Sequence, residues 1–329
     1  MKELLARDRE RLKPLADRLL ELALDSRQEE KKRLWMAENV ADDHILWPTV
    51  LLPALVRREV DWGVYFEMLG SRAGADDPLE AKRMVPAFPQ HIEAERVRFT
   101  DQQIDEEATQ KRLEQARELL GDRLRVWVRY PDLSYAPFDL AVRMRGLESL
   151  LLDTVDNPGG VHALMEAVTA ALAGHHRTRE ARAWINCFPD PEGRWSEVGF
   201  RVHCAYLEPG PRTGFPRLAD EWAYVSAQTS SGLGPEMFAE FVHPYNCRLA
   251  SLFHRDTVYY HGCECLDQKL EILAALPHLR RFHVSPWSSV AAAAGAPLDL
   301  NLSDIHSLNG RPELLRLWAE QAQEVACSA

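Results

Sequence analysis

After residue 218, the chain alternates between two kinds of apolar pattern. Short runs rich in aromatic and β-branched residues have the composition of strands; they are "EWAYVSAQ", "DTVYYHGC", "LRRFHVSPW" and "PLDLNLS". Between and after them, apolar residues recur at helical spacing in "PEMFAEFVHPYNCRLASLF", "LDQKLEILAAL" and "RPELLRLWAEQAQEVA". Strands that alternate with helices of this length predict a parallel sheet with helical crossovers.

The earlier part of the chain is mostly helical in pattern. Residues 1–40 have apolar positions at helical spacing, and "TDQQIDEEATQKRLEQARELLG" predicts a solvated helix that ends at Gly121. The alternating segment 122–132 predicts a strand that ends at Pro131. Segment 147–181 predicts two helical pieces that are separated by "NPGG" at 157–160.

Several strand–helix units in a chain of 329 residues favour a (β/α)₈ TIM barrel, an α/β fold, over an open sheet. The chain has no Gly-rich strand-to-helix fingerprint for a dinucleotide, which argues against a Rossmann fold. We therefore expect an N-terminal helical extension over residues 1–45 and the barrel over residues 46–329.

Composition narrows the function classes. The formal net charge of −11 argues against a nucleic-acid partner, which would require a basic face. The sequence contains no run of about 18 apolar residues, so we expect no membrane span. The charged N-terminus lacks the apolar region of a secretory signal, and this favours a cytoplasmic protein.

Candidate chemistry is concentrated in "YYHGCECLD", residues 259–267, where a predicted strand ends. In a (β/α)₈ barrel, active groups lie at the carboxyl ends of the strands. Side chains two residues apart in an extended segment point the same way, so those of His261 and Cys263 can converge on one point. Imidazole nitrogen and thiolate sulfur are both good zinc ligands. We therefore predict that His261 and Cys263 bind a metal.

The neighbouring strand ends supply further candidates. Glu221 and Tyr224 are candidate catalytic residues that would orient a substrate or relay a proton. Solvation or helix capping would equally explain the presence of Glu221 at a strand end. Packing at the barrel rim would equally explain Trp222 and Trp287. The candidate substrate-binding residues are Trp222, Gln228, Tyr260 and Trp287.

The chain resembles the uroporphyrinogen decarboxylase superfamily over roughly residues 140–290. The resemblance rests on "GPEMFAEFVHPYNCRLASLF" followed by "YYHGC". Members of the family carry a Ser-Pro-x-x-Phe-x-x-Phe-x-x-Pro-Tyr helix and then a strand ending in His-x-Cys, and the matching residues here are Pro235, Phe238, Phe241, Pro244 and Tyr245, then His261 and Cys263. The segment "LLLDTVDNPGGV" also matches a Leu-Leu-x-Asp-x-x-x-x-Pro-x-x-Val pattern of that family. Members of this superfamily are (β/α)₈ barrels, so the resemblance implies the same fold.

The resemblance implies one of two chemistries. Decarboxylation of uroporphyrinogen depends on an N-terminal Arg-Gln-Ala-Gly-Arg-like segment, and the equivalent region here, "HILWPTVLLPALVRREV", has no such motif. The other branch transfers methyl groups between a corrinoid and a thiol, or demethylates a small substrate, with zinc held by a His-x-Cys pair and a C-terminal cysteine. His261 and Cys263 match that pair.

The third zinc ligand departs from the family pattern. The usual Gly-Cys-x-x-Pro segment is missing, and Cys327 is the nearest C-terminal candidate. Cys265, Glu264 and Glu221 are alternatives. "HGCECLD" and "HVSPW" also resemble a branch of the superfamily whose strand ends in Cys-Cys-Glu, followed by a Leu-Asp helix and a Ser-Pro-Trp strand.

We therefore expect a zinc-dependent methyltransferase that moves a methyl group between a small substrate and a corrinoid (methylcobalamin) carried by a partner protein, or a thiol acceptor. A decarboxylase-like lyase and a non-catalytic barrel that binds a small molecule or a corrinoid are the alternatives. A homodimer is one assembly that the sequence leaves open.

Overall fold

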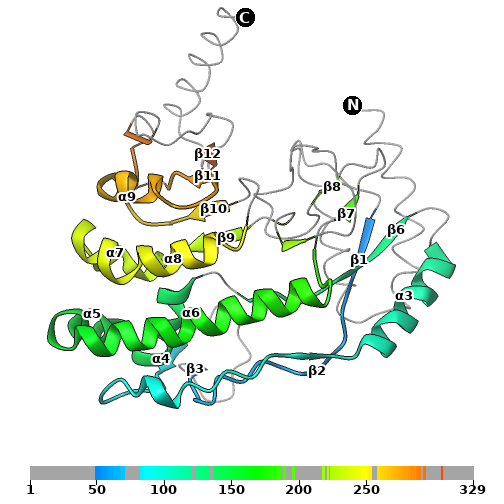
Figure 1. Ribbon diagram of the computed structural model, residues 1–329, viewed down its shortest axis with the longest axis horizontal. Helices are drawn as coiled ribbons and strands as arrows, with labels where there is room; N and C mark the ends of the chain where they lie inside the picture. Colours follow the sequence, from blue (N-terminus) through cyan, green and yellow to red (C-terminus); the bar gives the residue numbers. More distant parts are fainter. Residues whose placement is uncertain are drawn as a thin grey trace, which may run out of the picture. The chain divides into compact units, whose positions relative to one another are not determined.

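A computed structural model gives the structure (Figure 1). It describes residues 49–70, 82–120, 124–133, 136–186, 188–189, 195–196, 217–218, 221, 223–253, 258–285, 287–289, 292–293 and 305–306. The predicted extension over residues 1–45, the predicted strand "PLDLNLS" and the helix after it lie outside these residues, as do Trp222 and Cys327. The chain divides into two compact units, Met1–Glu59 with Gln102–Pro131 and Val60–Asp101 with Asp132–Ala329.

The first unit is a small α/β cluster. Its elements are β1 (Thr49–Pro53), β2 (Val56–Arg58), β5 (Gln103–Ile104), α3 (Glu106–Leu120) and β6 (Arg125–Arg129). β1 pairs with β6 in parallel and β2 with β5 in antiparallel orientation. Val126 and Val128 are buried alternately along β6, and Leu113 and Ala116 form part of the buried stripe of α3. The predicted strand of this region is confirmed, and the predicted helix is confirmed from Glu106 onward, since β5 occupies Gln103–Ile104.

The second unit contains a four-stranded parallel sheet with the strand order β9-β10-β11-β12. The strands are β9 (Ala223–Ser226), β10 (Val258–His261), β11 (Leu279–His283) and β12 (Ile305–His306). Helices α7 (Pro235–Phe241) and α8 (His243–Ala250) connect β9 to β10, and η4 (Asp267–Lys269) with α9 (Leu270–Ala274) connects β10 to β11. This is the predicted alternation of strands and helices. Closure into an eight-stranded barrel stays a prediction.

Three further helices of this unit are α4 (Pro137–Arg145), α5 (Leu147–Asp156) and α6 (Pro158–Ala181). Gly146 separates α4 from α5 with a φ of 90°, in the left-handed region that favours glycine. Only Asn157 separates α5 from α6, and its side chain accepts a hydrogen bond from Gly160 N at 3.1 Å. Pro158 begins α6 because a proline fits the first turn of a helix. The predicted break is therefore present but narrower than residues 157–160.

The segment predicted as one helix after β9 is two helices. α7 ends at Phe241 and α8 begins at His243, with Pro244 in its first turn. Proline has no N–H to donate to the preceding turn, so a continuous helix would lose a hydrogen bond there. Phe238, Phe241 and Leu249 are nonetheless all buried. The buried apolar stripe therefore continues from α7 into α8.

The remaining described elements of the second unit are short. They are β3 (Glu67–Gly70), β4 (Lys82–Val85), η1 (Ala94–Arg96), β7 (Phe188–Pro189), β8 (Trp195–Ser196) and η3 (Gln228–Gly232). β3 pairs with β4, and β7 with β8, each as an antiparallel pair. No helix of the described residues is long and apolar enough to cross a bilayer.

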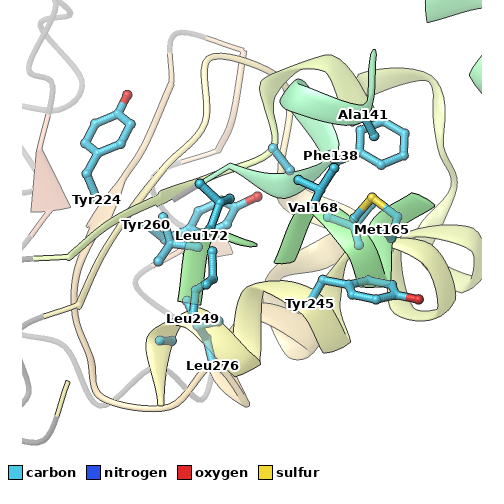
Figure 2. Packing of buried hydrophobic residues seen from close by; sticks show 14 of the residues in the cluster. Phe138, Ala141, Met165, Val168, Leu172, Tyr224, Tyr245, Leu249, Tyr260 and Leu276 are labelled. Carbon is cyan, nitrogen blue, oxygen red and sulfur yellow. The ribbon is translucent and has the colours of Figure 1, made fainter. Parts of the chain in front are cut away.

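Side chains from both faces of the parallel sheet belong to a large apolar core, Tyr260 from one face and Tyr224 and Tyr259 from the other (Figure 2). Tyr260 of β10 is fully buried in it and its ring stacks on that of Phe282 in β11, with centroids 6.1 Å apart. Leu172 of α6 and Leu249 of α8 belong to the same cluster. In Figure 2 the ring of Tyr224 points away from the side chains packed around Tyr260. Burial on both faces is typical of a parallel sheet.

A buried ion pair ties α6 to the segment before β9. Arg179 Nη2 lies 2.6 Å from Glu221 Oε1, and the two side chains are 0% and 3% exposed. The backbone N–H of Asn186 donates to the same carboxylate oxygen. His176 lies beside Arg179, and full burial, with the charges of Arg179 and His175, holds the pKa of His176 well below its usual value. Glu221 is thus paired inside the protein.

We expect Arg179→Met to lower the free energy of unfolding by about 3–5 kcal/mol, because it leaves the Glu221 carboxylate buried without its cation. Arg248→Met is the matched control: Arg248 pairs with Glu166 at the surface, where an ion pair contributes less than about 1 kcal/mol. Urea unfolding measures both values. Equal small losses in the two variants would contradict a buried Arg179–Glu221 pair.

Candidate metal centre

The candidate centre lies where neighbouring parallel strands end. His261 is the last residue of β10 and His283 is the last residue of β11. Tyr260 is the register partner of Phe282, so the two histidines follow at equivalent positions. Parallel strands have their carboxyl ends at the same edge, and both histidines lie on the face opposite Tyr260 and Phe282. The register therefore brings two imidazoles together.

Three possible ligand atoms converge at this edge. The Nε2 atom of His261 lies 3.2 Å from the Sγ atom of Cys263. One ligand atom from each of His261, Cys263 and His283 lies within 4.8 Å of the other two. The rings of His261 and His283 are stacked, with centroids 4.3 Å apart and an angle of 3° between them. The predicted pair is thus joined by a histidine from the next strand.

The residue between the predicted ligands has to be small. A Cβ atom on Gly262 would lie 2.7 Å from Cδ1 of Leu266 and 2.9 Å from Oε2 of Glu264. Real Cβ atoms do not approach other heavy atoms so closely, and Leu266 is fully buried. Glycine at this position therefore leaves room for the side chains of Leu266 and Glu264 beside the ligand loop.

Hydrogen bonds orient both imidazoles. The hydroxyl of Tyr259 lies 3.0 Å from Nδ1 of His261, so the other ring nitrogen, Nε2, is the one that faces Cys263. Nδ1 of His283 lies 2.8 Å from the carbonyl oxygen of Gly262. A carbonyl can only accept, so Nδ1 of His283 carries the hydrogen and Nε2 of the neutral ring carries the lone pair. Such outer contacts fix the orientation of metal-binding histidines.

Two ionisable groups beside the site have raised pKa values. Partial burial, and then the nearby carboxylate of Glu264, raise the pKa of the Cys263 thiol. Burial raises the pKa of Glu264 to about 7. Lys269 is buried nearby; its Nζ donates to the carbonyl of Ser230 at 3.0 Å and lies 4.8 Å from the ring centroid of Phe238. A metal ion would reverse the effect on the thiol, because it stabilises the thiolate.

The donor set fits zinc. Two imidazole nitrogens and one thiolate are a common zinc combination, with Zn–N distances of about 2.0–2.1 Å and a Zn–S distance of about 2.3 Å. Ligand atoms at tetrahedral angles would then stand about 3.3–3.6 Å apart. The His261–Cys263 distance of 3.2 Å is already close to this spacing. The longest separation in the cluster, up to 4.8 Å, would have to shorten by about 1 Å. One of the two parallel imidazoles would also have to rotate, because a metal ion lies in the plane of each ring that binds it.

Of the other predicted residues, the structure brings Tyr224 to the centre. The Tyr224 ring stacks on His261, with centroids 5.0 Å apart and an angle of 27° between them. Glu221 is instead paired with Arg179, and Tyr260 lies on the opposite face of β10. Gln228 begins η3 and is half-buried. The alternative ligands Glu264 and Cys265 are close in sequence but are not members of the three-residue cluster.

Trp287 lies in a loop that is tied to the ligand loop. Its side chain is 74% exposed. Ser285 Oγ donates to the carbonyl of Glu264 at 2.6 Å, and Ser288 Oγ accepts from Leu266 N at 3.0 Å. The loop after β11 is therefore pinned to the loop that carries Cys263, with Trp287 facing solvent.

Sequence reasoning missed His283. Its segment "LRRFHVSPW" was recognised as a strand, but nothing local to it marks a ligand. Its role depends on pairing with β10, which lies about 20 residues earlier and cannot be deduced from spacing. A signal was present: both strands end in histidine, one in "YYH" and the other in "RFH".

Comparisons with known proteins add little. No protein family matches the chain, and no curated protein does. Among solved structures, a methyltransferase from Methanosarcina mazei aligns with a TM-score of 0.37 and 12% sequence identity, over 77% of this chain and 71% of that chain. A likeness at this level does not establish a fold or an activity.

We expect His283→Ala to lower zinc affinity at least about tenfold, and as strongly as His261→Ala or Cys263→Ala, because each change removes one of three ligands. Tyr259→Phe should weaken binding less than the loss of a ligand does, since it removes only the partner of Nδ1. Cys247→Ala is the control, because Cys247 contacts His243 in α8. Competition with a chromogenic chelator measures all five. Wild-type affinity in His283→Ala would exclude His283 as a ligand.

Proposed function

We propose that this protein is a zinc-dependent methyltransferase that works with a corrinoid and a small thiol or methylated substrate. The observation that carries the proposal is the convergence of His261, Cys263 and His283 at the carboxyl ends of two parallel strands. In α/β folds with parallel strands this edge is the usual place for catalysis. The resemblance of the helix and strand segments to the corrinoid-linked branch of the uroporphyrinogen decarboxylase superfamily gives the reaction class.

The chain's own residues would prepare the site. His261, Cys263 and His283 would hold the metal, Tyr259 and the Gly262 carbonyl would orient the two imidazoles, and the Tyr224 ring would pack against His261. Bound zinc supplies a Lewis acid that keeps a substrate thiol in its nucleophilic thiolate form at neutral pH. A corrinoid, when bound, supplies the cobalt that carries the methyl group.

The open side of the site suits a large partner. Cys263 and Trp287 are both exposed, whereas Tyr224 is almost completely buried. The metal would thus be approached from the side of Cys263 and not through the core. An exposed tryptophan beside the opening offers a flat apolar surface for a planar cofactor or a partner protein.

Local charge argues against porphyrin decarboxylation. Uroporphyrinogen carries many carboxylates, and its binding requires concentrated positive charge. The described groups around the cluster include the acids Glu264 and Asp139, and Lys269 is turned to Ser230 and Phe238. The N-terminal segment that would supply arginines lacks the motif, and the net charge is −11. Electrostatics thus favour an uncharged or cationic substrate.

We expect the zinc-loaded protein to change the cobalamin spectrum, either with methylcobalamin and one of a panel of thiols or with cob(I)alamin and a methoxylated or methylamine donor. Cys263→Ser should slow the reaction at least about tenfold because it removes the thiolate ligand. Cys247→Ser, a cysteine in α8 with its own partner, should react like the wild type.

Two outcomes would contradict this function. Release of carbon dioxide from uroporphyrinogen, with no spectral change for any donor and acceptor, would establish the decarboxylase instead. Inactivity in both assays, with zinc bound, would favour a barrel that binds a small molecule or a corrinoid without turnover.

A further inference from the structure

Helix α6 carries a group of buried ionisable residues that the proposed reaction does not use. His175, His176 and Arg179 lie on its buried face, and all three are 0% exposed. Arg179 pairs with Glu221 in the segment before β9, and His175 pairs with Asp101 in the segment before β5. We call these five residues the α6 cluster. The cluster joins α6 to two segments that are distant in the sequence.

The contact between His176 and Arg179 requires a neutral imidazole. Nη1 of Arg179 lies 3.4 Å from Nδ1 of His176. A guanidinium can only donate, so Nδ1 of His176 accepts and carries no hydrogen. Protonation would place a hydrogen on Nδ1 that faces the N–H of Arg179, and it would add a second positive charge beside the guanidinium. At this separation and depth the two charges repel each other strongly.

The charged groups that face the two histidines come from three elements. Within the described part of the chain, Arg179 and His175 of α6 act on His176, and both lower its pKa after the larger effect of burial. Asp101, from the segment before β5, raises the pKa of His175, but burial lowers it more. Glu221, from the segment before β9, contacts the cluster through Arg179. The charged side chains of α4, α5, α7, α8 and η1, which pack against α6, are not among the described groups that shift either pKa.

We propose that the α6 cluster is an acid-sensitive contact, which holds α6 to the segment before β9 at neutral pH and weakens below about pH 6.5. This segment leads directly into the sheet of the candidate metal centre. Glu221 stands two residues before β9, and the ring of Tyr224 in β9 packs on His261 with centroids 5.0 Å apart. Acidification would thus loosen the strand beside the centre. The inference depends neither on zinc nor on methyl transfer.

The direction of the pH effect follows from proton binding. In an opened state His176 takes up a proton near its ordinary pKa of about 6.5, whereas in the closed cluster its pKa lies well below that value. Between the two values the opened state binds one proton more. Opening therefore becomes up to about tenfold more favourable for each pH unit of acidification. Above about pH 6.5 the ring is neutral in both states, and the contact keeps its full strength.

Hydrogen exchange in the intact protein, without added zinc or cobalamin, tests the inference. Exchange rates are first corrected for the intrinsic pH dependence of amide exchange. Protection of the amides in β9 should then fall by up to about tenfold per pH unit below about pH 6.5. His176→Gln stays neutral at every pH, so its protection should fall less steeply. His162→Gln is the matched control, because His162 is a partly exposed histidine of the same helix, and it should behave like the wild type.

Histidine NMR of the folded wild type keeps the test independent of any variant. At least one imidazole should still be neutral at about pH 5.5, and His176→Gln should lack one such signal. Protection that changes equally with pH in the wild type and in His176→Gln would overturn the inference. So would a spectrum in which all 12 histidines titrate near pH 6.5. Either result would leave the zinc site and the proposed function untouched.

Discussion

The candidate centre depends on the parallel pairing of β10 with β11. That pairing sets Tyr260 opposite Phe282 and so places His261 and His283 together at the end of the two strands. Two histidines that stand 22 positions apart in the chain would otherwise have no reason to meet. The stacking of the His261 and His283 rings follows from this register, as does the contact between Nδ1 of His283 and the carbonyl oxygen of Gly262.

The apolar face of the same strands holds the register. Tyr260 and Phe282 are fully buried and stacked, so a slip of β10 by one residue would separate these rings and bring His261 toward the core in place of Tyr260. Burying two large aromatic side chains stabilises the fold by several kcal/mol, about 1.5–3 kcal/mol for a ring such as that of Phe282. Side chains alternate between the two faces of β10 and β11, so the same register packs Tyr260 against Phe282 on one face and brings His261 beside His283 on the other. Glu221 has a structural role in this unit, because its buried ion pair with Arg179 holds the segment that leads into β9.

Local signals in the sequence were sufficient for part of this account. The helix that ends before Gly121, the strands β9, β10 and β11, and the convergence of His261 with Cys263 all follow from composition and from spacing within a few residues. Pro244 could have marked the break between α7 and α8. His283 and the pairing of Glu221 depend on contacts between distant segments, and periodicity within one segment carries no information about such partners.

The central claim is that His261, Cys263 and His283 bind one metal ion. Anomalous diffraction from crystals of the zinc-loaded protein, recorded on both sides of the zinc absorption edge, tests this claim most directly. We expect one strong anomalous peak at the carboxyl ends of β10 and β11, about 2.0–2.1 Å from an imidazole nitrogen of each histidine and about 2.3 Å from the sulfur of Cys263. A zinc peak bound by other residues, or no peak at this edge of the sheet, would contradict the account.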